Sequence, residues 1–182
     1  MNRKTAMKLF GLLGLLMLLS CGYADRHRNN SSCEQVLVDS LEVRVQDSLF
    51  SNVHYSRSQV LDALTQAQDS QVYYRLLALY GKTFFVSSDF DSILYYNRRV
   101  KEFSRNASQS SESLQSPQWN DVLSDVYNIE GNVWMQLNRP DSAITDYKKA
   151  YEYRLKGKKL HLLPDICINT ADAYLHRSDL AH

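Results

Sequence analysis

Residues 128–150 read NIEGNVWMQLNRPDSAITDYKKA, and this stretch decides the fold. It contains two runs with helical spacing of apolar residues, separated by the short polar segment 138–141. Pro140 suits the first turn of the second run, because proline has no amide hydrogen to donate there. Gly131 lies inside the first run, where glycine usually marks the close approach of a neighbouring helix. The stretch therefore predicts a closely packed pair of antiparallel helices.

The small and aromatic residues of this stretch are also regularly spaced. Trp134 follows Gly131 by three residues, Ala143 follows it by twelve, and Tyr147 and Ala150 come next. This spacing resembles the tetratricopeptide repeat (TPR), a helix–turn–helix unit of about 34 residues. The resemblance implies that Gly131 and Ala143 let the two helices approach. Trp134 and Tyr147 then fill the volume beside that contact, and Ala150 lets the next repeat dock.

A weaker copy of the same spacing lies upstream. Gly81 is followed three residues later by Phe84, and the turn would comprise residues 89–92. The copy departs from the family at Ile93 and Asn97, where a small residue and an aromatic residue are expected. We therefore predict a second, less regular helix pair here.

A third copy begins at Ala171, with Tyr174 three residues later. Its second helix would place a small residue at position 183, one residue beyond His182. A repeat helix cannot bury its apolar face alone, so we expect several apolar side chains of this copy to lack a partner. They are Ile166, Ile168, Tyr174 and Leu175. The sequence thus suggests the N-terminal piece of a longer protein, or a homo-oligomer whose second copy covers the open end.

The predicted fold class is all-α, a TPR-like antiparallel helix-pair solenoid with the last repeat incomplete. The helical domain covers residues 34–182, with weaker helical signals over 34–49 and 56–67. The repeats are placed at about 70–103, 124–157 and 164–182, and residues 104–116, rich in Ser, Gln and Glu, are predicted to be a mobile insertion. No segment predicts a convincing strand.

Composition excludes several function classes. The 182 residues include only 6 Gly and 3 Pro, and three of the glycines lie in the first 22 residues. This scarcity excludes a Gly-rich phosphate loop or a dinucleotide fingerprint, and it argues against a β-sandwich or barrel with many turns. The formal net charge of +1 gives no electrostatic bias towards nucleic acid, so no nucleic-acid partner is expected.

The N-terminal residues are predicted to be an export signal. Arg3, Lys4 and Lys8 give a positive start, and an apolar run of eleven residues follows from Leu9 to Leu19. The run is too short for a membrane span, which needs about 20 residues, and it has the length of a signal-peptide core.

The run ends in Leu18-Leu19-Ser20-Cys21, which resembles the lipobox of bacterial lipoproteins. The resemblance implies that residues 1–20 are removed and that Cys21 carries the lipid. Residues 21–33 are polar and are predicted to be a tether. The expected location is the cell envelope of a Gram-negative bacterium, anchored to a membrane and facing the periplasm or the surface. The alternative is an ordinary signal peptide that is cleaved nearby.

The sequence contains no recognisable catalytic or metal-binding motif. It has neither H-E-x-x-H nor G-x-S-x-G, and its five histidines include no pair spaced i, i+4. Cys33 and Cys167 are 134 residues apart and form no metal-ligand pair, and Cys167 is predicted to be a free buried thiol. We therefore expect no enzymatic activity, no cofactor and no metal.

Binding of a protein or peptide is the expected role of such an architecture, because stacked helix pairs present the first helix of each repeat on a concave face. Asn128 and Asn132 lie one turn apart and would hydrogen-bond an extended peptide backbone. The predicted concave-face residues are Arg75, Lys82, Phe85, Asn128, Asn132, Gln136 and Asp172.

An alternative function follows from a second resemblance. Residues 127–155, followed by LPDICIN at 163–169, are similar to the sensory region of bacterial histidine kinases that contain TPR repeats. In that family the repeats precede a membrane helix and a kinase core. The resemblance implies a truncated sensor region in signal transduction. The DNA sequence beyond codon 182 distinguishes this function from that of a free-standing binding module.

The lipobox gives a direct test. Cys21→Ser removes the thiol that would be acylated, so the variant should incorporate no labelled fatty acid when it is expressed in a Gram-negative host. The wild-type chain, labelled in parallel, is the control. Continued incorporation into the variant would show that Cys21 is not the lipid attachment site.

Overall fold

In a computed structural model, residues 34–107 and 116–179 are described. These two ranges are helical apart from short turns and contain no strand, which confirms the predicted all-α class. The helices are residues 34–48, α2 (Val53–Gln66), α3 (Ser70–Lys82), α4 (Phe90–Ala107), α5 (Pro117–Gln136), α6 (Pro140–Leu155), the short 3-10 helix η2 (Leu160–Leu162) and α7 (Leu163–Asp179).

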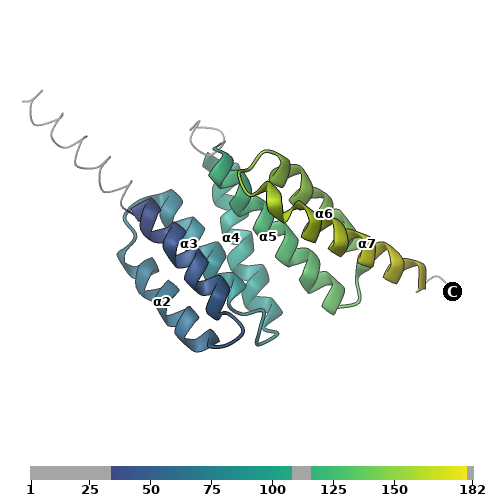
Figure 1. The fold of residues 1–182 in the computed structure, drawn as a ribbon, viewed down its shortest axis with the longest axis horizontal. Coiled ribbons are helices and arrows are strands. Elements are labelled where there is room, and N and C mark those ends of the chain that lie inside the picture. The colour runs from purple at the N-terminus through teal and green to yellow at the C-terminus, as the bar shows by residue number, and fades with distance from the viewer. Residues whose placement is uncertain (1–33, 108–115, 180–182) are drawn as a thin grey trace, which may run out of the picture.

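The helices follow one another in chain order, and each helix from α2 to α7 packs against the next (Figure 1). Helix 34–48, α3, α5 and α7 also contact one another in succession. Arg75 of α3 bonds to helix 34–48, α3 contacts α5, and Asn169 of α7 bonds to Asn128 of α5. Every second helix therefore belongs to one shared layer, and this layer carries the groove described below.

Polar side chains and prolines fix where the helices begin. Asn52 accepts the Tyr55 amide at the start of α2, and Ser116 accepts the Trp119 amide at the start of α5. Such caps satisfy backbone donors that have no partner inside the helix. The prediction that Pro140 lies in the first turn of a helix is confirmed, and the other two prolines also lie at helix starts. Pro117 and Pro140 are the first residues of α5 and α6, and Pro164 is the second residue of α7.

The turns after α3 and α5 share one backbone geometry. In each, the residue seven positions after the helix glycine has a positive φ, 53° at Ser88 and 57° at Asn138. The next amide donates to a carbonyl five residues earlier, which is the Schellman closure of a helix C-terminus. The two bonds are Asp89 N–H to Phe84 O, 3.2 Å, and Arg139 N–H to Trp134 O, 2.8 Å. The following helix begins one residue later in both cases.

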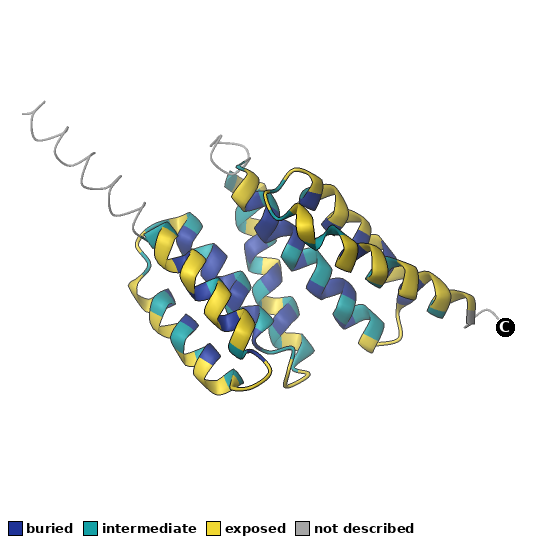
Figure 2. Cartoon of the chain, viewed as in Figure 1, coloured by how far each residue is buried: buried dark blue, intermediate teal, exposed yellow. Residues whose placement is uncertain are grey.

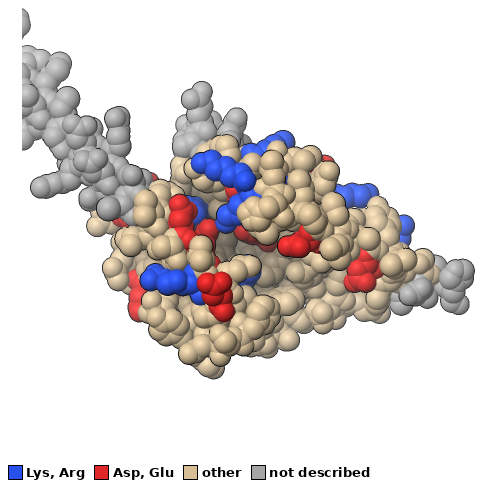
Figure 3. All heavy atoms as spheres, in the orientation of Figure 1, with Lys and Arg blue, Asp and Glu red and all other residues tan. Residues whose placement is uncertain are grey.

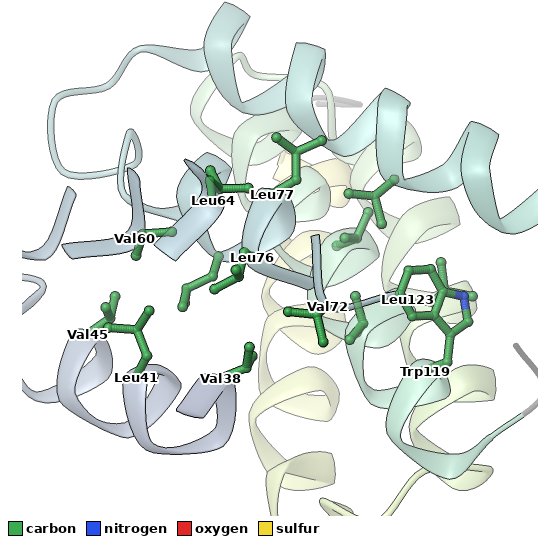
Figure 4. Close-up of a cluster of buried hydrophobic side chains, with 14 of the residues drawn as sticks. Val38, Leu41, Val45, Val60, Leu64, Val72, Leu76, Leu77, Trp119 and Leu123 are labelled. Carbon is green, nitrogen blue, oxygen red and sulfur yellow. The ribbon is translucent and has the colours of Figure 1, made fainter. Parts of the chain in front are cut away.

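The largest core cluster joins helix 34–48 to the helices from α2 to α5 (Figure 4). Its members are apolar residues at helical spacing, and Figure 2 shows the buried positions gathered where the helices face one another. Each fully buried Val or Leu side chain contributes about 1.5–3 kcal/mol to folding. The labelled members are Val38, Leu41, Val45, Val60, Leu64, Val72, Leu76, Leu77, Trp119 and Leu123.

The glycines inside α3 and α5 lie against the next helix. A Cβ at Gly131 would lie 2.5 Å from Cδ1 and 2.8 Å from Cζ of Tyr147, and closer still to Cε1. A Cβ at Gly81 would lie 3.1 Å from the Tyr96 Cβ. Ala143 and Ala150 are fully buried in α6, and the Ala150 carbonyl accepts the Ser124 hydroxyl of α5 at 2.8 Å.

Two predictions about the last helix are wrong. Cys167 is exposed, because the neighbouring Ile166 is the buried residue of this apolar run and adjacent side chains of a helix point about 100° apart. Ile166 does not lack a partner, since it is 2% exposed and packs into the cluster formed with α6. Ile168 and Leu175 are each 66% exposed, as expected.

The predicted insertion at 104–116 is also wrong in part. Residues 104–107 continue α4, and Ser116 caps α5. The indole nitrogen of Trp119 donates to the Ser104 hydroxyl at 3.0 Å, which ties the end of α4 to the start of α5. Residues 108–115 lie outside the described residues, and so do the signal peptide, the tether and Cys21.

The contact at Gly131 predicts a cost for any larger side chain. Gly131→Val should lower the free energy of unfolding by about 1–3 kcal/mol, because the added atoms would force the Tyr147 ring out of its position. Chemical denaturation measures the change. Gly81→Ala is the matched control and should cost less, since its Cβ contact is only slightly tight. Equal stability of Gly131→Val and the wild type would contradict the packing seen here.

Candidate functional site

A groove opens on the layer formed by alternate helices, and Figure 3 shows the hollow with charged side chains around it. Helix 34–48 and α3 line one side, and α5 with loop 156–159 lines the other. Two adjoining recesses, of about 300 Å³ and about 550 Å³, make up the groove. The lining residues that the two recesses share are Glu42, Gln46, Arg75, Lys82, Val122, Asp125 and Lys159.

One end of the groove is held by ion pairs around Arg75. Its Nη1 donates to Gln35 Oε1 at 2.5 Å, and its Nη2 donates to Asp39 Oδ1 at 2.7 Å and to Glu42 Oε1 at 2.8 Å. Burial alone lowers the pKa of Arg75, but the carboxylates of Glu42 and Asp39 outweigh it, and the pKa is raised. Arg75 therefore stays charged and fastens α3 to helix 34–48.

The second oxygen of Glu42 reaches across the groove. Glu42 Oε2 accepts from Lys159 Nζ at 3.0 Å, although the two residues are 117 positions apart in the chain. Burial lowers the pKa of Lys159, and the nearby Glu42 and Asp125 carboxylates raise it by more. The Glu42–Lys159 pair thus joins the first helix of the domain to the loop after α6.

Loop 156–159 is fixed in place by the buried carboxylate of Asp121. Asp121 accepts the backbone amides of Lys158 at 2.9 Å and Lys159 at 3.1 Å, and Arg154 Nη1 at 2.7 Å. A Cβ at position 157 would lie 2.7 Å from the Asp121 Cγ, so the loop needs Gly157 there. Arg154, itself 1% exposed, also pairs with Asp125.

The other end of the groove offers polar groups with spare donors. Asn128 Oδ1 accepts from Asn169 at 3.1 Å, and Asn132 Oδ1 accepts from the Tyr147 hydroxyl at 2.8 Å. Their Nδ2 groups have no hydrogen-bond partner among the described residues. Lys82 Nζ donates to Gln46 Oε1 at 2.8 Å and lies within 4.0 Å of no carboxylate in the described part of the chain.

Two buried polar atoms at the lining are also unpaired. Asn97, 1% exposed, donates Nδ2 to the Val126 carbonyl at 3.2 Å, while its Oδ1 has no partner within the described ranges. The Nε of Arg75 has none there either. Buried polar atoms without partners are uncommon and need an explanation such as an unfilled binding position. Leu49, Phe50 and Phe85 add apolar surface at the same recess.

The structure brings five of the seven predicted concave-face residues into the groove. Arg75, Lys82, Phe85, Asn128 and Asn132 all line the smaller recess. Arg75 is engaged by carboxylates of helix 34–48, so its role there is structural.

Gln136 and Asp172 do not line the groove. Gln136 is the last residue of α5, and Asp172 is exposed on α7. The repeat residues Ala171 and Tyr174 are also exposed on α7, where Lys148 and Arg177 lie over the Tyr174 ring.

Sequence reasoning missed the groove residues of helix 34–48 and of loop 156–159. Glu42 and Gln46 come from helix 34–48, Phe50 comes from the turn directly after it, and Lys159 comes from the loop. Helix 34–48 has no glycine–aromatic spacing that would mark it as part of a helix pair. Its only signal is the apolar series Val38, Leu41, Val45 and Leu49, which fixes the buried face but does not locate a groove.

Within 34–107 and 116–179, no group of three or more His, Cys, Asp or Glu residues is placed to hold a metal ion. Among the same residues, no helix combines the length and apolar character needed to cross a bilayer. Neither a known protein family, nor a curated protein, nor a solved structure matches the chain.

The arrangement around Asp121 predicts a large stability difference between two neighbouring carboxylates. Asp121→Ala leaves the buried Arg154 guanidinium without its buried carboxylate partner and frees the loop amides, so it should cost about 3–5 kcal/mol. Asp125→Ala removes a half-exposed partner of the same guanidinium and should cost about 1 kcal/mol or less. Urea unfolding of both variants measures the difference. Equal losses would show that Asp121 does not fix loop 156–159.

Proposed function

We propose that this chain is a non-enzymatic module that binds an extended segment of a protein or peptide in the groove. The observation that carries the proposal is the pair of side-chain amides on α5. The oxygens of Asn128 and Asn132 are already bonded inside the protein, so their Nδ2 donors remain for a ligand. Such fixed side chains bind at a low entropic cost, because their orientation is set before the ligand arrives.

The spacing of the two amides suits an extended backbone. Four residues along a helix correspond to about 6 Å, and carbonyls two residues apart in an extended strand lie about 6.6 Å apart. An extended segment could therefore give one carbonyl to each asparagine while a side chain contacts Phe85. Lys82 at the same end would attract an acidic group.

We further propose that the helix pairs are TPR-like repeats. The support is the turn geometry shared by Ser88 and Asn138, which lies at the same distance from Gly81 and Gly131. In both pairs the glycine contacts the following helix, at Tyr96 and Tyr147. Repeats of this kind stack so that one layer of helices presents a continuous surface, and that surface here contains the groove.

We propose that the module is anchored in the bacterial cell envelope through a lipid on Cys21. The formal net charge is only +1 before processing, which gives little overall attraction to an anionic bilayer, so the lipid would be the membrane contact. We also propose that a second copy of the chain packs on Ile168 and Leu175 in a homo-oligomer, since both side chains are exposed on α7. A sensor region of a signalling protein would use the same groove, with an output domain beyond residue 182.

The groove can be tested without knowing the natural ligand. A random peptide library is selected on the purified full chain, and the affinity of a selected peptide is measured by calorimetry. Lys82→Ala and Asn128→Ala should each weaken binding about tenfold, because each removes a donor at the recess, worth about 1.4 kcal/mol. Arg98→Ala, on the exposed side of α4, is the control and should not change the affinity. Unchanged affinity in all three variants would place the binding site elsewhere.

A further inference from the structure

Glu42 occupies the middle of the groove and is shared by two cations. Its Oε1 lies 2.8 Å from Arg75 Nη2, and its Oε2 lies 3.0 Å from Lys159 Nζ. The side chain is only 20% exposed, and it lines both recesses. A carboxylate of the protein itself therefore lies where the two recesses meet.

We infer that Glu42 is an internal stand-in for an acidic side chain of the ligand, so that the groove accepts an extended peptide segment rich in acidic residues. The ligand carboxylate replaces Glu42 at Lys159, and Glu42 turns towards solvent. This inference rests on the proposed function, and it names the chemical class of the peptide.

The charges around Glu42 support this exchange. Lys159 is 38% exposed, so an incoming carboxylate can reach it from solvent. Arg75 keeps Asp39 as a partner when Glu42 leaves, and its unpaired Nε gives it a further donor. The exchange leaves no buried cation without a carboxylate, which keeps its energetic cost low.

Lys82 makes the binding free energy of an acidic ligand favourable, because it offers a cation that is not yet paired with a carboxylate of the described residues. It lines both recesses together with Glu42, and it has only the Gln46 amide as a partner among the described residues. A second acidic side chain would pair with Lys82 while the first one pairs with Lys159. Four more carboxylates line the larger recess, those of Asp39, Asp47, Asp121 and Asp125. Asp121 and Asp125 act electrostatically on Lys159 but are paired with Arg154, and Asp39 is paired with Arg75. Among the described residues none of the four forms a salt bridge with Lys82 or Lys159.

The probe for this inference is a fluorescein-labelled hexaglutamate peptide with an amidated C-terminus, compared with the matching hexaglutamine peptide. Fluorescence anisotropy with the purified full chain gives the affinities. Glu42→Gln frees Lys159, so its affinity for hexaglutamate should rise about threefold to tenfold over the wild type, more at low salt than at 150 mM NaCl. Lys82→Ala should weaken hexaglutamate binding.

Asp62→Asn is the matched control, since it also removes one negative charge but lies exposed on α2 away from the groove. Its affinity should stay within about twofold of the wild type at 150 mM NaCl, because exposed charges beyond a Debye length are screened. If Glu42→Gln melts at a lower temperature, Glu42→Asp keeps the charge but is too short to bridge both cations, and it should also bind hexaglutamate more tightly than the wild type.

Three results would overturn the inference. They are equal affinity for the two peptides, no gain in Glu42→Gln and Glu42→Asp, or a gain in Asp62→Asn as large as that in Glu42→Gln. In each case, a loss of affinity of library-selected peptides for the Lys82→Ala variant would still support the groove as a peptide-binding site. The two proposals therefore fail separately. A free C-terminal carboxylate on hexaglutamine distinguishes a terminal carboxylate from acidic side chains, and binding through the terminus alone would also contradict the inference.

Discussion

Asp121 is buried where α5, the end of α6 and the following loop meet, and the form of the groove depends on its contacts. The carboxylate accepts one side-chain donor and two backbone amides, so it acts as a fixed point for three chain segments. The requirement for glycine at position 157 follows from the same contact. Because the loop cannot shift, Lys159 is held opposite Glu42, and Arg75 is held by Glu42 in turn. The core shared by helix 34–48, α3 and α5 packs the two walls together, and the buried Asp121 carboxylate fixes loop 156–159 on top of them.

The two ends of the groove differ in how completely their polar groups are satisfied. The end at Arg75 is neutralised by its own carboxylates, and such pairs position helices more than they stabilise them. The end at Lys82 keeps donors without partners among the described residues. A protein interior normally pairs its polar groups, so an end that leaves them unpaired is the place where a ligand gains most. The two ends of the groove therefore differ, and the proposed acidic segment would gain most free energy of binding at the end that contains Lys82.

Local features of the fold could be predicted from the sequence, and longer-range ones could not. Pro117, Pro140 and the glycines of α3 and α5 have local effects on the backbone, so helix starts and close contacts follow from residue type and spacing. The groove residues of helix 34–48 and loop 156–159 depend on contacts between distant segments, such as Glu42 with Lys159. The exposure of Cys167 was mispredicted for the same reason. An apolar run shows that one face of a helix is buried, and only the packed neighbour shows which one.

The pair formed by Glu42 and Lys159 has a consequence for how the domain folds. Helix-pair arrays usually have contacts only between neighbours, so they fray from their ends and lose cooperativity as they lengthen. The contact between Glu42 and Lys159, 117 positions apart in the chain, connects helix 34–48 directly to the loop after α6. Bringing residues so far apart in the chain together costs conformational entropy. The packing of the intervening helices offsets this cost, so we expect the pair to form late in folding. Once formed, the pair links helix 34–48 to the loop after α6, so we expect these two segments to unfold together.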